Sequence, residues 1–268
     1  MQNTLSKSFL WLPTLLLLSQ LVVPDAVLAQ TNEVENSGTT ALRIQVRSLD
    51  AKFIGSGVGD LNVQVTDVAT GRVLDHGRIT GPTGDTDSMM TEGQTRGHTP
   101  SAPDSAAWTA QLDIDRPTRV RIAVTGPLDV NNSIQQQDTT LWMLPGVDRV
   151  DPPLVLHLPG LIVDVIELDS DSADGIDLTA SVTMLCGCPI TAGGLWRADD
   201  FVVIASLYQD GEKLTEANLS FTGTTNQFAG RLDRPDSGKF TLYVSAHQRS
   251  TANTGVQQQA LIMPEPAT

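Results

Sequence analysis

The sequence predicts an all-β protein made of two consecutive antiparallel β-sandwich domains that follow a cleaved signal peptide. Apolar and polar residues alternate with a period of two throughout the chain, as in strands that are buried on one face. Clusters of Gly, Pro, Asp and Asn separate these segments, and apolar residues at helical spacing are hard to find after Ala29. Leu42, Ile44 and Val46 illustrate the pattern, because they share one strand face while polar side chains occupy the other.

The N-terminus has the three-part pattern of a secretory signal peptide. Lys7 precedes an apolar run over residues 9–23, and small residues end the segment at Ala29, where we expect cleavage. The run is shorter than the about 20 residues that a membrane-spanning helix needs, so we expect no integral membrane segment after cleavage. Residues 1–29 are therefore predicted to be a signal peptide and residues 30–40 a flexible N-terminal segment. The predicted location is periplasmic or secreted.

The chain is acidic, with a formal net charge of -14. A field of this sign repels phosphate backbones and anionic lipid, so we expect no nucleic-acid partner and no membrane-surface binding. The charge either maintains solubility or attracts cations or a basic partner.

The first domain is predicted to cover residues 41–159. Gly71 supplies the positive φ that a tight turn needs between its second and third strands. The segment 81–106 is rich in Gly, Thr, Ser, Asp and Pro, which predicts a long loop. Strands are expected near 41–49, 61–68, 72–79, 107–114, 118–125, 139–144 and 153–158.

The second domain is predicted to cover residues 160–264. The Pro-Gly pair at 159–160 follows a proline-rich stretch and would turn the last strand of one domain directly into the first strand of the next. A connection this short limits relative motion of the domains. Strands are expected near 161–168, 177–186, 200–209, 217–222, 226–233, 238–247 and 256–263.

Two short resemblances accompany this pattern. The segment from Val63 to Leu74, with Gly71 at its turn, resembles the opening hairpin of transthyretin-like or carboxypeptidase-regulatory-like sandwiches. The second half resembles bacterial immunoglobulin-like domains. Both resemblances imply β-sandwich modules, and neither family has a catalytic residue that can be carried over to this sequence.

The two cysteines of the chain lie in the segment Met184-Leu185-Cys186-Gly187-Cys188, which is the strongest candidate in the sequence for a chemically reactive or metal-binding site. Cys186 and Cys188 predict a disulfide that clamps the end of a strand, with Gly187 allowing the backbone to fold back. Two alternatives stay open. Met184, Cys186 and Cys188 together offer the soft donors that copper(I) prefers, and a small-ring disulfide is also compatible with thiol redox chemistry.

Two loops are candidates for ligand or ion binding. The loop 81–106 is interpreted either as a disordered or solvated loop or as a lid over a ligand, in which case Met89, Met90 and His98 would face that ligand. Alternating aspartates over 169–177 supply the oxygen ligands of calcium, although the spacing does not follow the EF-hand pattern. Calcium at a hairpin tip and an ordinary solvated turn are the two interpretations.

The function predicted from these observations is an exported, non-catalytic binding or structural protein of the envelope. Its partner would be an unknown envelope protein or a small ligand. The candidate binding loops contain Trp196 and Asn253. Trp108 and Trp196 either pack in the core or at a strand edge, which suits a chain with few aromatic residues, or serve as platforms for stacking a sugar ring. The alternative is a periplasmic copper-binding or thiol-redox protein. Local sequence contains no hydrolase motif that would favour an enzyme.

Overall fold

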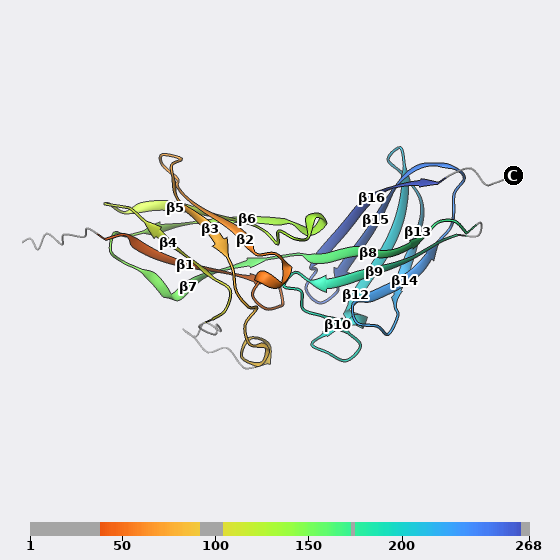
Figure 1. Cartoon of the computed structure of the whole chain (residues 1–268), viewed down its shortest axis with the longest axis horizontal. Helices are drawn as coiled ribbons and strands as arrows, with labels where there is room; N and C mark the ends of the chain where they lie inside the picture. The colour runs from red at the N-terminus through yellow and green to blue at the C-terminus, as the bar shows by residue number, and fades with distance from the viewer. Residues whose placement is uncertain (1–37, 92–103, 173–174, 264–268) are drawn as a thin grey trace, which may run out of the picture. The chain divides into compact units, whose positions relative to one another are not determined.

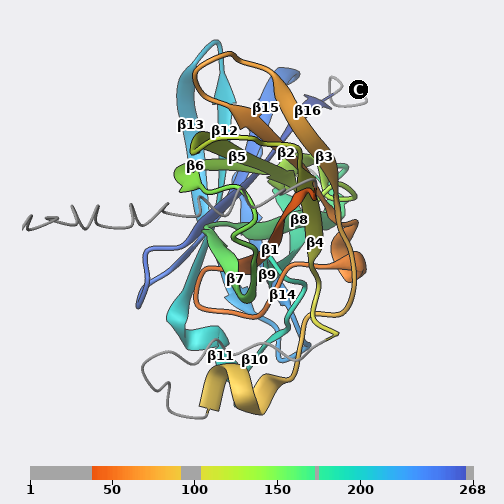
Figure 2. The ribbon, with the colours of Figure 1, turned by 90° about the vertical axis from the view of Figure 1, so that its left-hand side faces the viewer.

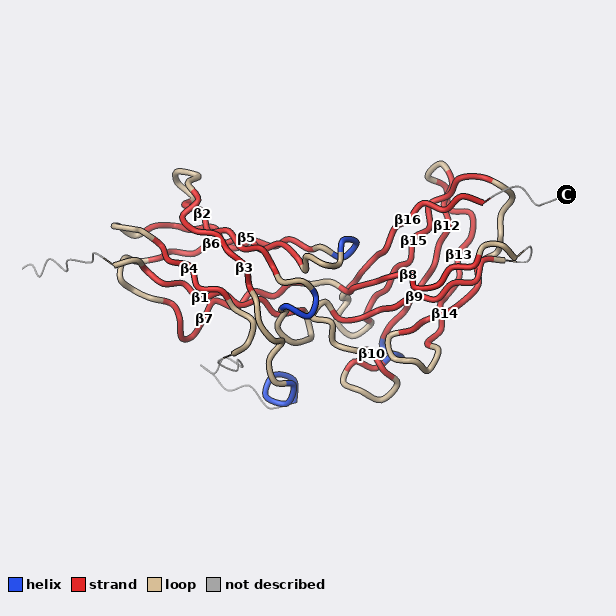
Figure 3. The backbone as a smooth tube through the Cα atoms, in the orientation of Figure 1, coloured by secondary structure: helices blue, strands red, loops and turns tan. Residues whose placement is uncertain are grey.

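The computed structural model describes residues 38–91, 104–172 and 175–263. These residues form an all-β protein, as predicted (Figures 1 and 3). By their contacts, residues Asn36–Thr268 belong to one unit. The part of this unit up to Leu158 is its N-terminal half, and the part from Leu161 is its C-terminal half. The strands are β1 (Thr40–Ser48), β2 (Leu61–Asp67), β3 (Val73–Ile79), β4 (Trp108–Leu112), β5 (Thr118–Gly126), β6 (Gln135–Met143), β7 (Arg149–Leu158), β8 (Leu161–Asp169), β9 (Ile176–Met184), β10 (Ile190–Thr191), β11 (Trp196–Arg197), β12 (Phe201–Gln209), β13 (Glu212–Phe221), β14 (Gln227–Leu232), β15 (Gly238–Gln248) and β16 (Thr254–Met263).

Each strand expected from the alternating pattern is present, with two kinds of difference. β6, β7 and β13 begin four or five residues earlier than expected, because the polar run starting at Gln135, the stretch around Pro152 and the polar start of β13 at Glu212 lack the apolar alternation that marks a strand. β10 and β11 are a two-residue parallel pair within a segment expected to be a loop. Four short helical segments, η1 (Ser56–Val58), η2 (Asp87–Thr91), η3 (Asn131–Ser133) and η4 (Ala198–Asp200), accompany the strands.

The N-terminal half consists of two sheets. One has the order β4-β1-β7 and the other β3-β2-β5-β6, and Figure 2 shows them as two layers. The inward residues Ile44, Val65 and Ile122 are fully buried, which reflects the alternation seen in the sequence. The sheets are antiparallel, as expected, except that β1 and β7 run parallel in this half. These strands are the first and last of this half, so the intervening chain supplies the long crossover that parallel neighbours need.

The C-terminal half is built on a seven-stranded sheet of order β16-β15-β12-β13-β14-β9-β8. β13 links its two parts, because its first residues pair with β12 while Ser220 and Phe221 pair with β14. Its two edge strands also meet, since the side chain of Gln257 on β16 accepts a hydrogen bond from the backbone N–H of Val165 on β8. The sheet thus encloses its own apolar core.

The predicted domain boundary near 159–160 lies between β7 and β8, which only a two-residue connection separates. The division into two domains stays a prediction. Within the described residues, no helix is long and apolar enough to cross a membrane.

Candidate functional site

The two cysteines form a disulfide at the end of β9, as the spacing predicted. The backbone folds back through Gly187, whose φ of 78° lies in the left-handed region that favours glycine. Two backbone hydrogen bonds close the turn, from Gly187 N to Met184 O at 2.8 Å and from Met184 N to Cys188 O at 3.1 Å. Cys186 and Cys188 are 3% and 5% exposed, so the disulfide is part of the core.

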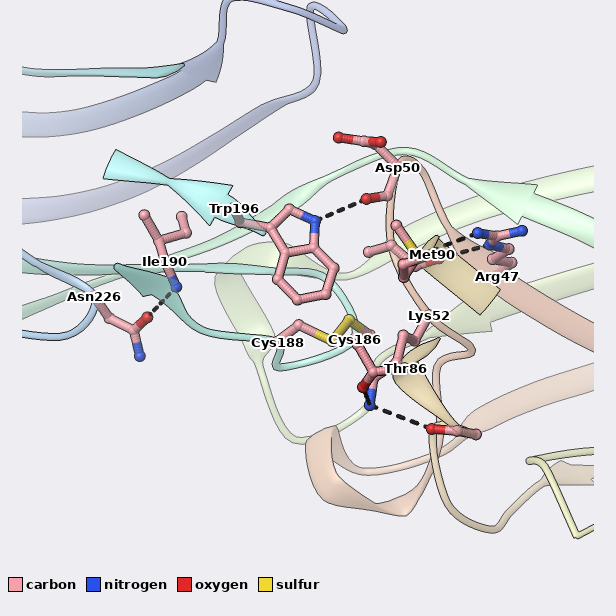
Figure 4. Close-up of a disulfide and its surroundings, with 12 residues drawn as sticks. Arg47, Asp50, Lys52, Thr86, Met90, Cys186, Cys188, Ile190, Trp196 and Asn226 are labelled. Carbon is pink, nitrogen blue, oxygen red and sulfur yellow. Dashed lines mark hydrogen bonds between the residues drawn. A yellow bond between two sulfur atoms is a disulfide. The ribbon is translucent and has the colours of Figure 1, made fainter. Parts of the chain in front are cut away.

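This cysteine turn faces the N-terminal half of the chain. A Cβ atom added to Gly187 would lie 3.0 Å from Cγ1 of Val58 in η1, so the turn packs closely against that segment. Beside the disulfide, the indole of Trp196 points toward the loop after β1 (Figure 4). Its Nε1 donates a hydrogen bond to the backbone carbonyl of Asp50 at 2.8 Å. The cysteine turn therefore belongs to a joint between the two halves.

A second set of hydrogen bonds links the β15–β16 turn to this joint. Gln248 donates through Nε2 to Oδ2 of Asp50 at 2.8 Å, and its backbone N–H donates to the carbonyl of Asn253 at 2.8 Å. Asn253 accepts from Gly160 N at 2.6 Å and donates to Gly160 O at 3.0 Å. Gly160 lies between β7 and β8, so the buried side-chain amide of Asn253 binds both the backbone N–H and the carbonyl of this connecting residue.

The two residues predicted for binding loops, Trp196 and Asn253, are thus 6% and 1% exposed. Each side chain is occupied by a backbone partner, Trp196 by Asp50 and Asn253 by Gly160. The structure does not bring them into contact with each other around a shared hollow. As placed, they fasten the chain and leave little surface for a ligand.

The three soft donors proposed for copper, Met184, Cys186 and Cys188, lie on the cysteine turn. Both cysteine sulfurs are used in the disulfide, so neither is the thiolate that copper(I) binds. Within the described residues, no group of three His, Cys, Asp or Glu side chains could hold a metal ion. The copper hypothesis stays a prediction that applies to the reduced protein. The proposed calcium turn includes residues 173–174, which lie outside the described residues, so that hypothesis also stays a prediction.

The residues of the segment proposed as a lid differ in their burial. Met89 is 2% exposed and packs in the core. Arg47 donates through Nη2 to the backbone carbonyl of Met89 at 3.0 Å and to the sulfur of Met90 at 3.3 Å. Burial lowers the pKa of Arg47 below its usual value. His98 lies outside the described residues. In this arrangement η2 is anchored to β1 by its methionines.

A different surface, which was not predicted from the sequence, combines exposed polar side chains with an aromatic ring. It is the outer face of the β3-β2-β5-β6 sheet, which we call the polar sheet face. Trp142 is 64% exposed there, whereas Trp108 packs against the core. Alternation along β6 could have revealed it, because Trp142 is in phase with Gln136 and Asp138 on the exposed side. The face is defined by Asn62, Gln64, Thr66, His76, Arg78, Arg119, Arg121, Ala123, Thr125, Gln136, Asp138, Thr140 and Trp142.

The polar sheet face contains a shallow depression of about 610 Å³. Ala123 lies within it and pairs with Gln64 on β2 and Asp138 on β6, so a small side chain is surrounded by longer ones. Arg121 donates through Nε to Oδ2 of Asp138 at 3.0 Å. Arg119 donates through Nη2 to Oγ1 of Thr140 at 3.2 Å. Groups that can donate or accept hydrogen bonds thus line a concave surface.

Comparisons with known proteins give no family. No family model matches the chain, and no curated protein matches it. Among solved structures, the fimbrial anchor protein Mfa2 from Porphyromonas gingivalis is 10% identical with a TM-score of 0.22, and the match covers 84% of this chain and 83% of that one. The apo structure of Bacteroides uniformis beta-glucuronidase 3 is 12% identical with a TM-score of 0.21, covering 83% of this chain and 25% of that one.

Proposed function

We propose that the chain is an exported, non-catalytic binding or structural protein of the cell envelope whose two halves act as one rigid piece. The buried joint between the halves is the observation that carries this proposal. Trp196 and Gln248 both reach Asp50 across the joint, and Asn253 holds the connection at Gly160. The signal peptide expected at residues 1–29 supports export.

Rigidity follows from how the joint is made. The links to Asp50 are partly buried hydrogen bonds and those to Gly160 are buried, so breaking the latter leaves buried backbone groups without their partner. The connection between Leu158 and Leu161 is too short to act as a flexible linker. A further bond, from Val163 N to Oγ of Ser133 at 3.4 Å, joins β8 to η3. A protein that transmits force or presents a surface at a fixed angle needs a connection of this kind.

The strand order supports assigning a sandwich module to each half. In the C-terminal half, β8-β9-β14-β13 and β12-β15-β16 follow the ABED and CFG order of an immunoglobulin-like constant domain. In the N-terminal half, β2 and β3 form the hairpin on which the resemblance to transthyretin-like sandwiches rests.

Expression of the full chain with its own N-terminus in a bacterial host tests the export part of the proposal. We expect the protein in the periplasm or medium, with an intact mass that shows cleavage after Ala29. Retention of the uncleaved chain in the cytoplasm would overturn it.

Scanning calorimetry of the mature protein tests the rigid joint. We expect one unfolding transition, because neither half can unfold without breaking the buried contacts of the other. Two separate transitions, with limited proteolysis near residues 159–160 releasing two folded halves, would contradict a rigid piece.

A further inference from the structure

We propose that the polar sheet face binds an acidic polysaccharide, whose carboxylate or sulfate groups contact arginines while a sugar ring stacks on Trp142. This inference rests on the proposed binding role and names its ligand class. It does not depend on the joint, since the polar sheet face lies wholly within the N-terminal half.

Charge is the first argument. The chain carries a net charge of -14, yet the polar sheet face carries Arg78, Arg119 and Arg121 against one carboxylate, Asp138. The pairing of Arg121 with Asp138 still leaves two guanidinium groups on the face. Charges more than about 10 Å away are largely screened at 0.1 M salt, so an anion bound here responds mainly to these arginines. A guanidinium also matches the planar geometry of a carboxylate.

Hydrogen-bonding chemistry is the second argument. The amides of Asn62, Gln64 and Gln136 line the depression together with His76 and Thr125. An amide side chain both donates and accepts hydrogen bonds, as does a sugar hydroxyl. An amide can therefore donate to one hydroxyl and accept from another. A surface that recognised only a point charge would not need this set of neutral groups.

Trp142 supplies the third argument. It lies six residues after Gln136 on the same side of β6, a separation of about 20 Å along an antiparallel strand. Its cross-strand partner is Arg119, so an exposed aromatic ring and a cation are neighbours at one end of the face. An elongated ligand could therefore stack on the indole and extend into the depression beside Ala123.

These features favour a saccharide over a protein partner. The centre of a protein interface is depleted of charge and rich in apolar and aromatic groups. Here the centre is polar, and the exposed Trp142 lies at its edge. A phosphate backbone would also match the arginines, but single-stranded DNA has no free sugar hydroxyls along its chain to meet the amides of Asn62, Gln64 and Gln136, whereas an acidic polysaccharide does.

The test is isothermal titration of the mature full chain with a polygalacturonate oligosaccharide. A maltose oligosaccharide of equal length, a poly-glutamate peptide and a single-stranded DNA oligonucleotide are titrated in parallel. We expect binding of polygalacturonate that weakens as NaCl is raised, with the other three at least about tenfold weaker. Equal or tighter binding of any of the three would overturn the assignment to an acidic saccharide, as would no binding of polygalacturonate.

Variants place the site. Arg78→Gln with Arg119→Gln should weaken polygalacturonate binding about tenfold or more, and Trp142→Ala should weaken it severalfold. Arg231→Gln and Ile262→Ala are matched controls at exposed positions of the C-terminal half and should bind as the wild type does. Unchanged binding in the polar sheet face variants would overturn the site. Calorimetry on the same samples reports the joint separately, so failure of this inference can be told from failure of the proposed function.

Discussion

The indole Nε1 of Trp196 donates a hydrogen bond to the backbone carbonyl of Asp50, 146 positions earlier in the chain. The same aspartate accepts a second bond through its carboxylate from Gln248. One short loop after β1 thus receives two side chains from the C-terminal half, next to the disulfide (Figure 4). This relationship makes the cysteine turn part of a structural joint.

Replacing Trp196 by Phe should destabilise the protein by about 1 kcal/mol, because the ring keeps most of its packing while the carbonyl of Asp50 loses its partner. Urea denaturation followed by circular dichroism measures the change. Trp142→Phe is the matched control and should leave the midpoint unchanged, since that indole is exposed. Equal midpoints for Trp196→Phe and the wild type would show that the bond adds nothing to the joint.

Asn253→Ala should cost about 2 kcal/mol, because it removes an acceptor and a donor from two buried backbone groups of Gly160. Asn253→Asp keeps an acceptor for Gly160 N but places a buried carboxylate oxygen against Gly160 O, so it should be at least as destabilising as Asn253→Ala at pH 7. Asn132→Ala, at an exposed position, should have no effect. If the exposed control is as damaging as Asn253→Ala, the hydrogen bonds to Gly160 are not the cause.

The cysteine pair should be oxidised and free of copper when the mature protein is isolated from the periplasm. The intact mass should be two hydrogens below the reduced value, with no thiol titratable in denaturant. Removing the disulfide with Cys186→Ala and Cys188→Ala, which bury no new hydroxyl, should cost less than about 2 kcal/mol, because the closed loop is very short.

Met184→Leu separates the disulfide from the copper hypothesis. It conserves volume in the core and should cost less than about 1.5 kcal/mol while removing the thioether. Copper that co-purifies with the wild type and is lost in both Met184→Leu and Cys186→Ser would reverse the structural interpretation. Metal analysis by mass spectrometry decides between them.

Protonation of Asp67 should lower the free energy of unfolding in acid. The N–H of Ala69 donates to its carboxylate at 2.8 Å, and this bond, helped by Thr70, lowers the pKa of Asp67. A lowered pKa in the folded state stabilises the fold above the unfolded value, which is about 3.9 for Asp. That stability is lost as the pH falls from there through the folded pKa. Asp67→Asn should flatten the dependence of the urea midpoint on pH in this range, and an unchanged slope would contradict the assignment.

The alternation of apolar residues was enough to predict most of the strands, although not the short β10 and β11. At β1 and β2 the same side chains that alternate in the sequence, such as Ile44 and Val65, are buried in the core. Local spacing also predicted the disulfide, because Cys186 and Cys188 need only Gly187 between them to fold back. These features depend on neighbours in the chain, and short-range geometry determines them.

The use of individual polar and aromatic side chains could not be predicted in this way. Trp196 and Trp142 each directly follow a leucine, yet Trp196 is buried against Asp50 and Trp142 is 64% exposed. Which of them meets water depends on what the rest of the chain places against each strand. The sequence by itself determined the all-β class, most strands and the cysteine turn. Only the tertiary structure decided that this turn lies in a joint and that arginines, amides and Trp142 share one face, because such contacts join residues far apart in the chain.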